Sequence, residues 1–120
     1  MASILIGDGD GDLRCLVATE LTVGGHEVLH AADGLAAITA ALRHQPDLIL
    51  LDCLMPHLSG RDVCARLRRQ PSFERTPIVL MTTSESKLDE MQGFLAGATD
   101  YIHKPFAPIA LRCRIEAALG

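Results

Sequence analysis

Three short stretches of the chain are almost continuously apolar: residues 4–6, 48–51 and 78–81. Each is rich in Ile, Leu and Val, and each is bounded by Asp, Gly, Pro, Ser or Thr. Unbroken apolar runs of this length are typical of strands in a parallel sheet that is buried on both faces. Two shorter and more polar stretches, residues 27–30 and 101–103, fit edge strands of the same sheet.

Segments with helical periodicity separate these strands. Pro46 and Gly97 mark the ends of two of the helices, Asp33 fits an N-cap, and Pro108 fits a first-turn position. In the second helix we expect Leu35, Ile38, Ala41 and Leu42 to face inward. The apolar positions at three- and four-residue spacing are Leu13, Leu16, Val17, Leu21, Leu35, Ile38, Ala41, Leu42, Val63, Leu67, Leu88, Met91, Leu95, Leu111, Ile115 and Leu119.

The order of elements is strand–helix, repeated five times within 120 residues. This pattern requires right-handed crossovers and predicts an α/β domain with a parallel sheet and helices on both faces. Apolar residues make up 48% of the chain and charged residues 22%, so the composition is that of a folded domain and excludes disorder. We therefore expect residues 1–120 to form one domain.

The charge, the lengths of the apolar runs and the cysteine content argue against several classes of function. The net charge is −4 and no stretch concentrates Lys and Arg, so we expect no direct contact with nucleic acid. No apolar run approaches the roughly 18 residues of a membrane span, so we expect no membrane association and a cytoplasmic location. The four cysteines lack CxxC spacing and fit small core residues of a reducing compartment: Cys15, Cys53, Cys64 and Cys113.

The residues that carry chemistry follow the predicted strands. Asp8 follows the first strand, Asp52 the third, Thr82 the fourth and Lys104 the fifth. The carboxyl ends of parallel strands form the ligand-binding edge of an open α/β sheet. Carboxylates clustered with a lysine and a hydroxyl need a cation for stability, and they favour a metal ion or a phosphoryl group as ligand.

These residues belong to five motifs that resemble the receiver domain of bacterial two-component response regulators, the CheY-like family. The resemblance covers essentially the whole chain and implies a flavodoxin-like, doubly wound (βα)5 domain. Its five-stranded sheet would have the strand order 2-1-3-4-5, which is the order of CheY itself. The motifs are residues 4–8, residues 47–56 with Gly60, residues 77–82, residues 97–101 and residues 104–106.

The resemblance implies a phosphorylation site. Asp52 would accept a phosphoryl group from a histidine kinase or a phosphotransfer protein, with Lys104 and Thr82 as its catalytic partners. Mg²⁺ would be bound by the carboxylates of Asp8 and Asp52 and by the backbone carbonyl of Leu54. The cations would offset the charge of roughly −1.5 to −2 that phosphorylation adds. The protein would not be an enzyme beyond its own phosphoryl transfer and dephosphorylation.

The resemblance also implies a switch. Thr82 would bind a phosphoryl oxygen, Tyr101 would follow it inward, and the Lys104–Pro105 bond would be cis. The face formed by the fourth helix, the fifth strand and the fifth helix would then signal to an output domain, a downstream protein or a second copy of the chain. Leu54 and Ser84 stand at the positions that set phosphoryl lifetime in this family, and an apolar Leu54 predicts slow hydrolysis.

One position departs from the family pattern. Receivers usually carry two adjacent acids after the first strand, whereas here Gly9 follows Asp8. The loss of one ligand predicts weak Mg²⁺ binding, which Asp10 or a water molecule would partly restore. The alternative reading is a degenerate receiver that acts as a phosphorylation-independent protein-interaction module.

Other readings of the same residues are weaker. Residues 7–12 place Asp at the first, third and fifth positions of a calcium loop, but Leu13 and Thr19 replace its glycine and its glutamate. As a dinucleotide fingerprint, the segment has Asp12 in place of the third glycine. Asp12 fits a first-turn acid that complements the helix dipole. A hydrolase with Asp52 as nucleophile is disfavoured, because its loop offers no second acid–base carboxylate and the chain has no cap domain.

Overall fold

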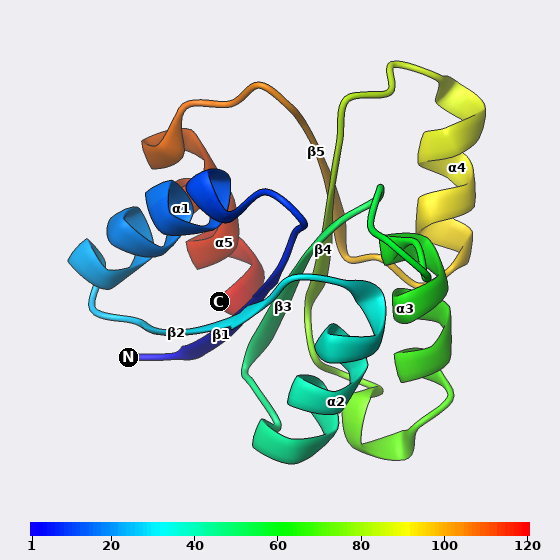
Figure 1. The fold of residues 1–120 in the computed structure, drawn as a ribbon, viewed down its shortest axis with the longest axis horizontal. Helices are drawn as coiled ribbons and strands as arrows, with labels where there is room; N and C mark the ends of the chain where they lie inside the picture. Colours follow the sequence, from blue (N-terminus) through cyan, green and yellow to red (C-terminus); the bar gives the residue numbers. More distant parts are fainter.

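The computed structural model describes residues 1–120, in which five parallel strands form one sheet (Figure 1). The strand order is β2-β1-β3-β4-β5, as expected, and the predicted fold class is confirmed. β1 lies between β2 and β3, so the chain changes direction across the sheet after β2. The strands are β1 (Ser3–Gly7), β2 (Glu27–Ala31), β3 (Leu48–Asp52), β4 (Ile78–Thr82) and β5 (Asp100–His103).

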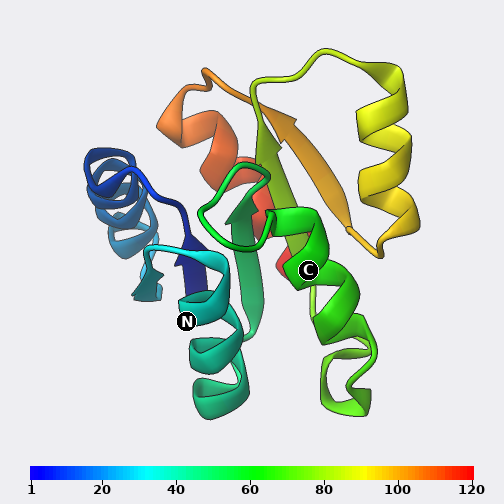
Figure 2. The same ribbon diagram turned by 45° about the vertical axis from the view of Figure 1, so that its right-hand side comes forward.

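Helices cover both faces of the sheet (Figures 1 and 2). α1 (Gly11–Val23) and α5 (Pro108–Leu119) pack together on one face. α2 (Gly34–His44), α3 (Gly60–Arg68) and α4 (Lys87–Leu95) lie on the other face. A short 3₁₀ helix (Pro71–Phe73), which the sequence pattern did not predict, precedes β4. None of the helices has the length and apolar character needed to cross a membrane.

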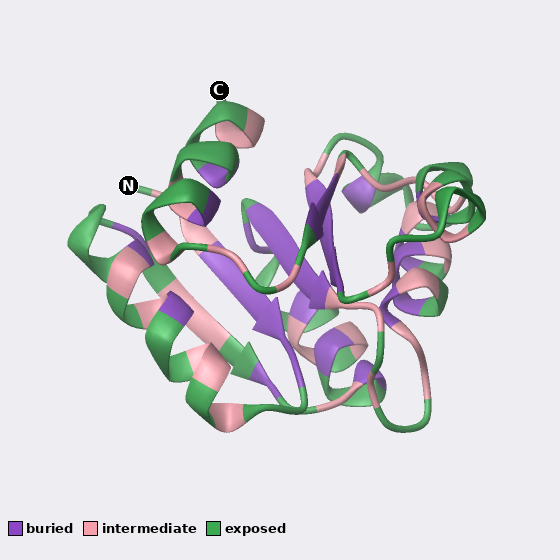
Figure 3. Ribbon diagram, turned by 90° about the horizontal axis from the view of Figure 1, so that it is seen from above, coloured by how far each residue is buried: buried purple, intermediate pink, exposed green.

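The central strands supply two separate cores, one on each face of the sheet. Alternate residues such as Leu5 and Ile49 pack under α2 and α3, whereas their neighbours Ile4 and Leu48 pack under α1 and α5. All four side chains are fully buried, and Figure 3 shows the central strands of the sheet coloured as buried. A strand that is covered on both faces needs apolar residues at every position, which explains the unbroken runs.

Polar side chains cap four of the five helices. Asp33 accepts a hydrogen bond from the amide of Ala36, as predicted for an N-cap. Asp10, Ser59 and Ser86 cap α1, α3 and α4 in the same way. These caps fix where each helix leaves the carboxyl edge of the sheet.

The inward face of α2 differs from the prediction. Gly34, Ala37 and Ala41 are its buried residues, whereas Leu35 and Leu42 are 52% and 46% exposed. The first of these, Gly34, lets the start of the helix lie close to the loop after β3: a Cβ on Gly34 would lie 2.5 Å from the carbonyl oxygen of Leu58. Because the closest face has no room for large side chains, the leucines lie beside it.

The exposure of other predicted apolar positions also differs from the periodicity. Leu16 of α1 is exposed, as are Leu88, Met91 and Leu95 of α4, where only Gly93 is buried. In α4 the exposed side chains have no neighbouring helix to cover them, because the helix packs chiefly on β5 at the edge of the sheet.

Two of the four cysteines are not core residues. Cys64 is buried and Cys53 is half-buried, but Cys15 and Cys113 are exposed, and all four are free thiols. Cys15 lies two residues before the buried Val17, which is about 200° around a helix of 3.6 residues per turn. Cys113 stands in the same relation to Leu111 and Ile115. The prediction of core positions for Cys15 and Cys113, which was based on their apolar neighbours in the sequence, is therefore wrong.

Candidate functional site

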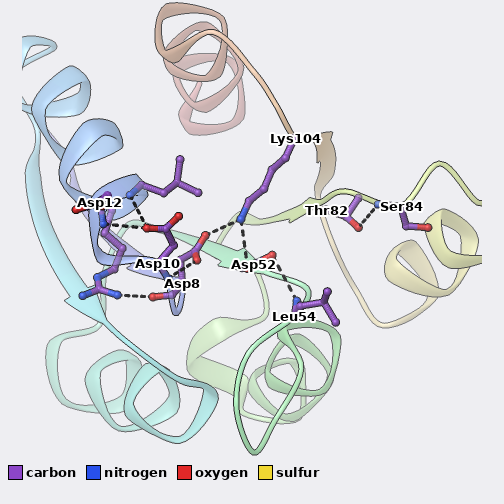
Figure 4. Close-up of polar contacts among 10 residues, drawn as sticks. Asp8, Asp10, Asp12, Asp52, Leu54, Thr82, Ser84 and Lys104 are labelled. Atoms are coloured by element: carbon purple, nitrogen blue, oxygen red, sulfur yellow. Dashed lines mark hydrogen bonds and ion pairs between the residues drawn. The ribbon is translucent and has the colours of Figure 1, made fainter.

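The acids that end β1 and β3 meet the lysine that follows β5 at the carboxyl edge of the sheet (Figure 4). The Nζ atom of Lys104 lies 2.8 Å from Oδ2 of Asp8 and 3.2 Å from Oδ2 of Asp52. The parallel register brings the ends of these strands to the same edge, although Asp8 and Lys104 are 96 residues apart in the chain. The predicted juxtaposition of these three residues is therefore present.

Burial strengthens the electrostatic interactions among these three side chains, because little solvent screens them. The side chains of Asp8, Asp52 and Lys104 are 2%, 14% and 17% exposed. Burial, assisted by the charge of Asp8, raises the pKa of Asp52 against the opposing effect of Lys104. Burial acts to lower the pKa of Lys104, but the hydrogen bond to Asp8 and the charges of both carboxylates outweigh it and raise that pKa. The single ammonium of Lys104 thus forms ion pairs with both carboxylates.

Backbone contacts hold Asp8 in place. Its Oδ1 accepts a hydrogen bond from the amide of Asp10 at 2.8 Å, and its own amide donates to the carbonyl of Ala31. Nη1 of Arg14, one turn into α1, donates to the carbonyl of Asp8. Arg14 was not among the predicted site residues, and no sequence motif marks it.

The two residues after Asp8 contribute little to a cation site. Oδ1 of Asp10 accepts from the amides of Asp12 and Leu13 at 3.0 Å and 3.1 Å, so this carboxylate caps α1. This role does not favour the predicted use of Asp10 as a metal ligand. Gly9 has room for a side chain: a Cβ there would make ordinary van der Waals contact at 3.8 Å with its nearest neighbours, Ala32 and Pro56.

The donor set fits a magnesium ion that keeps several of its waters. Mg²⁺ prefers oxygen ligands and is usually bound by one or two carboxylates together with water and phosphate. Asp8 and Asp52 are two such carboxylates, and Leu54 follows Asp52 closely enough for its amide to lie 3.4 Å from Oδ1. No group of three or more His, Cys, Asp or Glu side chains is arranged to hold a metal ion. The site therefore offers Mg²⁺ a sparse set of ligands.

The predicted switch residues share a cavity next to this group. Thr82 and Tyr101 are both buried, and the Thr82 hydroxyl accepts a hydrogen bond from the amide of Ser84 at 3.0 Å. The Ser84 hydroxyl in turn donates to Asp89 of α4 at 2.7 Å. The cavity has a volume of about 290 Å³, and its lining includes Cys53, Thr82, Ser84, Asp89 and Tyr101. Burial raises the pKa of the Tyr101 phenol.

Two further predicted features lie at this edge. The Lys104–Pro105 peptide bond is cis. Gly60 lies so close to β3 that a Cβ there would be 2.2 Å from the carbonyl oxygen of Asp52. The side chain of Leu54 is 77% exposed, so in this conformation most of its surface faces solvent.

The family model described as "Response regulator receiver domain" matches residues 4–116. The chain is 39% identical over 119 residues to the DNA-binding dual master transcriptional regulator RpaA of Synechocystis, covering 99% of this chain and 49% of that protein. It is 36% identical over 116 residues to the alkaline phosphatase synthesis transcriptional regulatory protein PhoP of Bacillus subtilis, covering 97% of this chain and 48% of that protein. The chain therefore spans about half the length of these curated relatives.

Solved structures agree with these sequence matches. The chemotaxis response regulator CheY4 of Vibrio cholerae superposes with a TM-score of 0.94 at 33% identity, covering 98% of both chains. The receiver domain of the sensor histidine kinase PA1611 from Pseudomonas aeruginosa superposes with a TM-score of 0.90 at 29% identity, covering 99% of this chain and 98% of that one. That structure is described with a magnesium ion coordinated in its active-site cleft.

Proposed function

The chain belongs to the receiver domain family of two-component response regulators, and on that premise we propose that Asp52 accepts a phosphoryl group from a histidine kinase or a phosphotransfer protein. The observation that carries this proposal is the position of the Lys104 ammonium between the carboxylates of Asp8 and Asp52. A cation held beside the acceptor can stabilise the negative charge that develops on a transferring phosphoryl group.

The proposed reaction needs little covalent chemistry from the protein. An oxygen of the Asp52 carboxylate attacks phosphorus while the bond between phosphorus and the donor's histidine nitrogen breaks, giving an acyl phosphate. Lys104 neutralises part of the added charge, and the Thr82 hydroxyl donates a hydrogen bond to a phosphoryl oxygen. Mg²⁺, when bound by Asp8, Asp52 and the backbone carbonyl of Leu54, supplies further positive charge to the phosphoryl oxygens. We propose no enzymatic role for this domain beyond its own phosphoryl transfer and dephosphorylation.

We expect this site to bind Mg²⁺ weakly. Gly9 provides no carboxylate, and Asp10 is engaged at the start of α1. A unit charge at about 4 Å is worth about 4 kcal/mol at an effective dielectric constant of 20, so one missing carboxylate matters. The loss is partly offset because Asp8 and Asp52 are repelled by one fewer negative charge.

The switch follows from the hydrogen bonds around Thr82. The hydroxyl oxygen accepts a hydrogen bond from the Ser84 amide here, so its own hydrogen is available to donate to a phosphoryl oxygen. Thr82 and Tyr101 line one cavity, so movement of Thr82 changes the space around the ring. Tyr101 lies on β5 against α4, and α4 exposes Leu88, Met91 and Leu95. We propose that this face, formed by α4, β5 and α5, carries the signal to an output domain, a downstream protein or a second copy of the chain.

The names of the curated relatives indicate which process the signal could control. They are transcriptional regulators about twice as long as this chain, and one is named as DNA-binding. The expectation of no direct contact with nucleic acid is therefore not supported for the protein as a whole. We propose control of transcription as the output. The cytoplasmic location stays a prediction.

A degenerate receiver is the second candidate. The observation that favours it is that Lys104 pairs with both carboxylates, while the position of the missing acid is held by Gly9. Such a protein would bind its partners through the same fold with no phosphoryl transfer.

Incubation with acetyl phosphate over a range of Mg²⁺ concentrations, read by intact mass, separates the two candidates. We expect the mass of one phosphoryl group to appear in the wild type and to be absent in Asp52→Asn. A wild type that gains no mass even at saturating Mg²⁺, while Gly9→Asp does, would establish the degenerate receiver. The decay of the phosphorylated species then tests the predicted slow hydrolysis.

A further inference from the structure

A groove between α2 and α3 has no role in the proposed phosphorylation. These helices lie side by side in both views (Figures 1 and 2). The groove has a volume of about 350 Å³ and is lined by Ile38, Leu42, Arg66, Leu67, Arg69 and Gln70. Its α3 residues come from the end of the helix that is remote from Asp52, since α3 starts at the carboxyl edge and runs back along the sheet.

One side of the groove is formed by Ile38 and Leu42, which continue an apolar stripe on α2 that begins at Leu35, outside the groove lining. Leu35, Ile38 and Leu42 are spaced by three and four residues, which places them within about 60° of one another around the helix. Leu42 and Leu35 are roughly half exposed, and Ile38 is partly buried. Apolar side chains at this spacing are the pattern by which one amphipathic helix packs along another.

The other side of the groove is positively charged. Arg66 and Arg69 are exposed, and no carboxylate lies within ion-pair distance of either guanidinium. α2 contains no acidic residue, and its last turn adds Arg43 and His44. The one acid of α3, Asp62, is in its first turn. In a chain with a net charge of −4, these unpaired arginines form a local region of opposite sign.

We propose that this α2–α3 groove binds an amphipathic helix of a partner protein whose apolar side faces Leu35, Ile38 and Leu42 and whose flanking acidic residues face Arg66 and Arg69. The apolar stripe would supply affinity through burial, and the arginines would select an acidic helix and set its direction. The proposal does not depend on phosphorylation of Asp52. An anionic membrane is a poorer fit, because the stripe is narrow and lies in a groove between two helices.

Two designed helical peptides test the proposal. Both carry leucines at heptad spacing; one has glutamates and the other lysines at the flanking positions. In a titration followed by amide NMR spectra, we expect the glutamate peptide to shift the signals of Ile38, Leu42 and Leu67. The lysine peptide should bind at least about tenfold more weakly.

Charge reversal provides the sharpest comparison. The double variant Arg66→Glu, Arg69→Glu should bind the glutamate peptide more weakly and the lysine peptide more tightly than the wild type does. The matched control, Arg75→Glu with Lys87→Glu, makes the same change in net charge at exposed positions outside the groove and should behave as the wild type. Leu42→Ser should weaken binding, whereas Leu95→Ser on α4 should not.

Four results would overturn the proposal. The first is binding that maps to α4, or no binding at all. The second is equal binding of the two peptides by the wild type. The third is sedimentation with phosphatidylserine vesicles that requires Arg66 and Arg69, which would make the groove a membrane site. The fourth is self-association that Leu42→Ser abolishes, which would make the occupant a second copy of the chain.

Discussion

The ring of Tyr101 packs directly against the backbone of Gly93. A Cβ built on Gly93 would lie 3.0 Å from Cε1 and 3.1 Å from Cδ1 of that ring. Glycine inside a helix costs about 1 kcal/mol relative to alanine, so α4 is locally weakened at this position. The absence of a side chain there is what lets the ring lie buried between α4 and β5.

Replacement of Gly93 by alanine should therefore displace the ring. Overpacking costs about 1–3 kcal/mol, whereas the gain in helix propensity is about 1 kcal/mol, so we expect net destabilisation. The chain has one tyrosine and no tryptophan, so intrinsic fluorescence reports on Tyr101 alone. Quenching by acrylamide should increase in the variant. Gly11→Ala, where a Cβ meets only the flexible end of Arg14 at 3.4 Å, is the control, and unchanged quenching in Gly93→Ala would contradict the prediction.

Lys104→Met should leave two carboxylates facing each other without a cation. Removal of one partner from a buried ion pair typically costs about 3–5 kcal/mol, and we expect the lower end because Lys104 retains some solvent exposure. Asp52→Asn added to Lys104→Met should restore part of the loss, because it removes one of the two charges. Urea denaturation of the four proteins in this cycle measures the coupling, and strictly additive free energies would refute it.

Asp52→Asn should stabilise the protein in a pH-dependent way. Burial and the charge of Asp8 raise the pKa of Asp52 above its ordinary value of 3.8, so the folded protein holds this proton more tightly than the unfolded chain. The contribution of Asp52 to stability therefore falls as pH rises through the interval above 3.8, and at neutral pH its charge is a cost. Asparagine does not ionise, so the variant should be more stable than the wild type at neutral pH.

Unfolding free energies of wild type and Asp52→Asn, measured in EDTA between about pH 4 and pH 8, check this sign. Acids remote from position 52 titrate equally in both proteins, so the difference reports on the charge at this position and on its immediate partners. The advantage of the variant should shrink toward the acidic end of the range. A difference that stays constant with pH, or a variant less stable at neutral pH, would contradict the assignment.

Gly9→Asp should bind Mg²⁺ at least about tenfold more tightly than the wild type, because a carboxylate is added at a position that has room for a side chain. Gly9→Asn has nearly the same shape without the charge and is the matched control. Isothermal titration calorimetry with Mg²⁺ gives the three affinities. Equal values for the wild type and the aspartate variant would show that Gly9 does not limit the site.

Arg68→Met should strongly destabilise the protein. The guanidinium donates to three backbone carbonyls, those of Phe73, Thr76 and Gly97, at 2.6–2.9 Å. Loss of one hydrogen bond to a charged group costs about 1.5–3 kcal/mol, so we expect at least about 3 kcal/mol in total. The exposed neighbour Arg66→Met should change stability by less than about 0.5 kcal/mol. Thermal unfolding compares the two, and similar melting temperatures would contradict this role.

Local patterns in the sequence determined the order of the elements and much of the site. The unbroken apolar runs identified the central strands, because a strand covered on both faces requires apolar residues at every position. Asp33 and Pro108 were predicted at the helix starts that they occupy. The convergence of Asp8, Asp52 and Lys104 followed from topology, since parallel strands end at one edge.

Only the tertiary structure decided which face of each helix is buried and what each polar group contacts. Periodicity identifies an apolar side of α2, but in the fold Ala37 and Ala41 are the residues buried in the core, and Leu35 and Leu42 are left half exposed. Arg14 and Arg68 bind backbone carbonyls. Every residue has such a carbonyl, so no residue type in the sequence marks these contacts. Helix faces and carbonyl contacts depend on the distances between packed elements, and those distances are set by the whole fold.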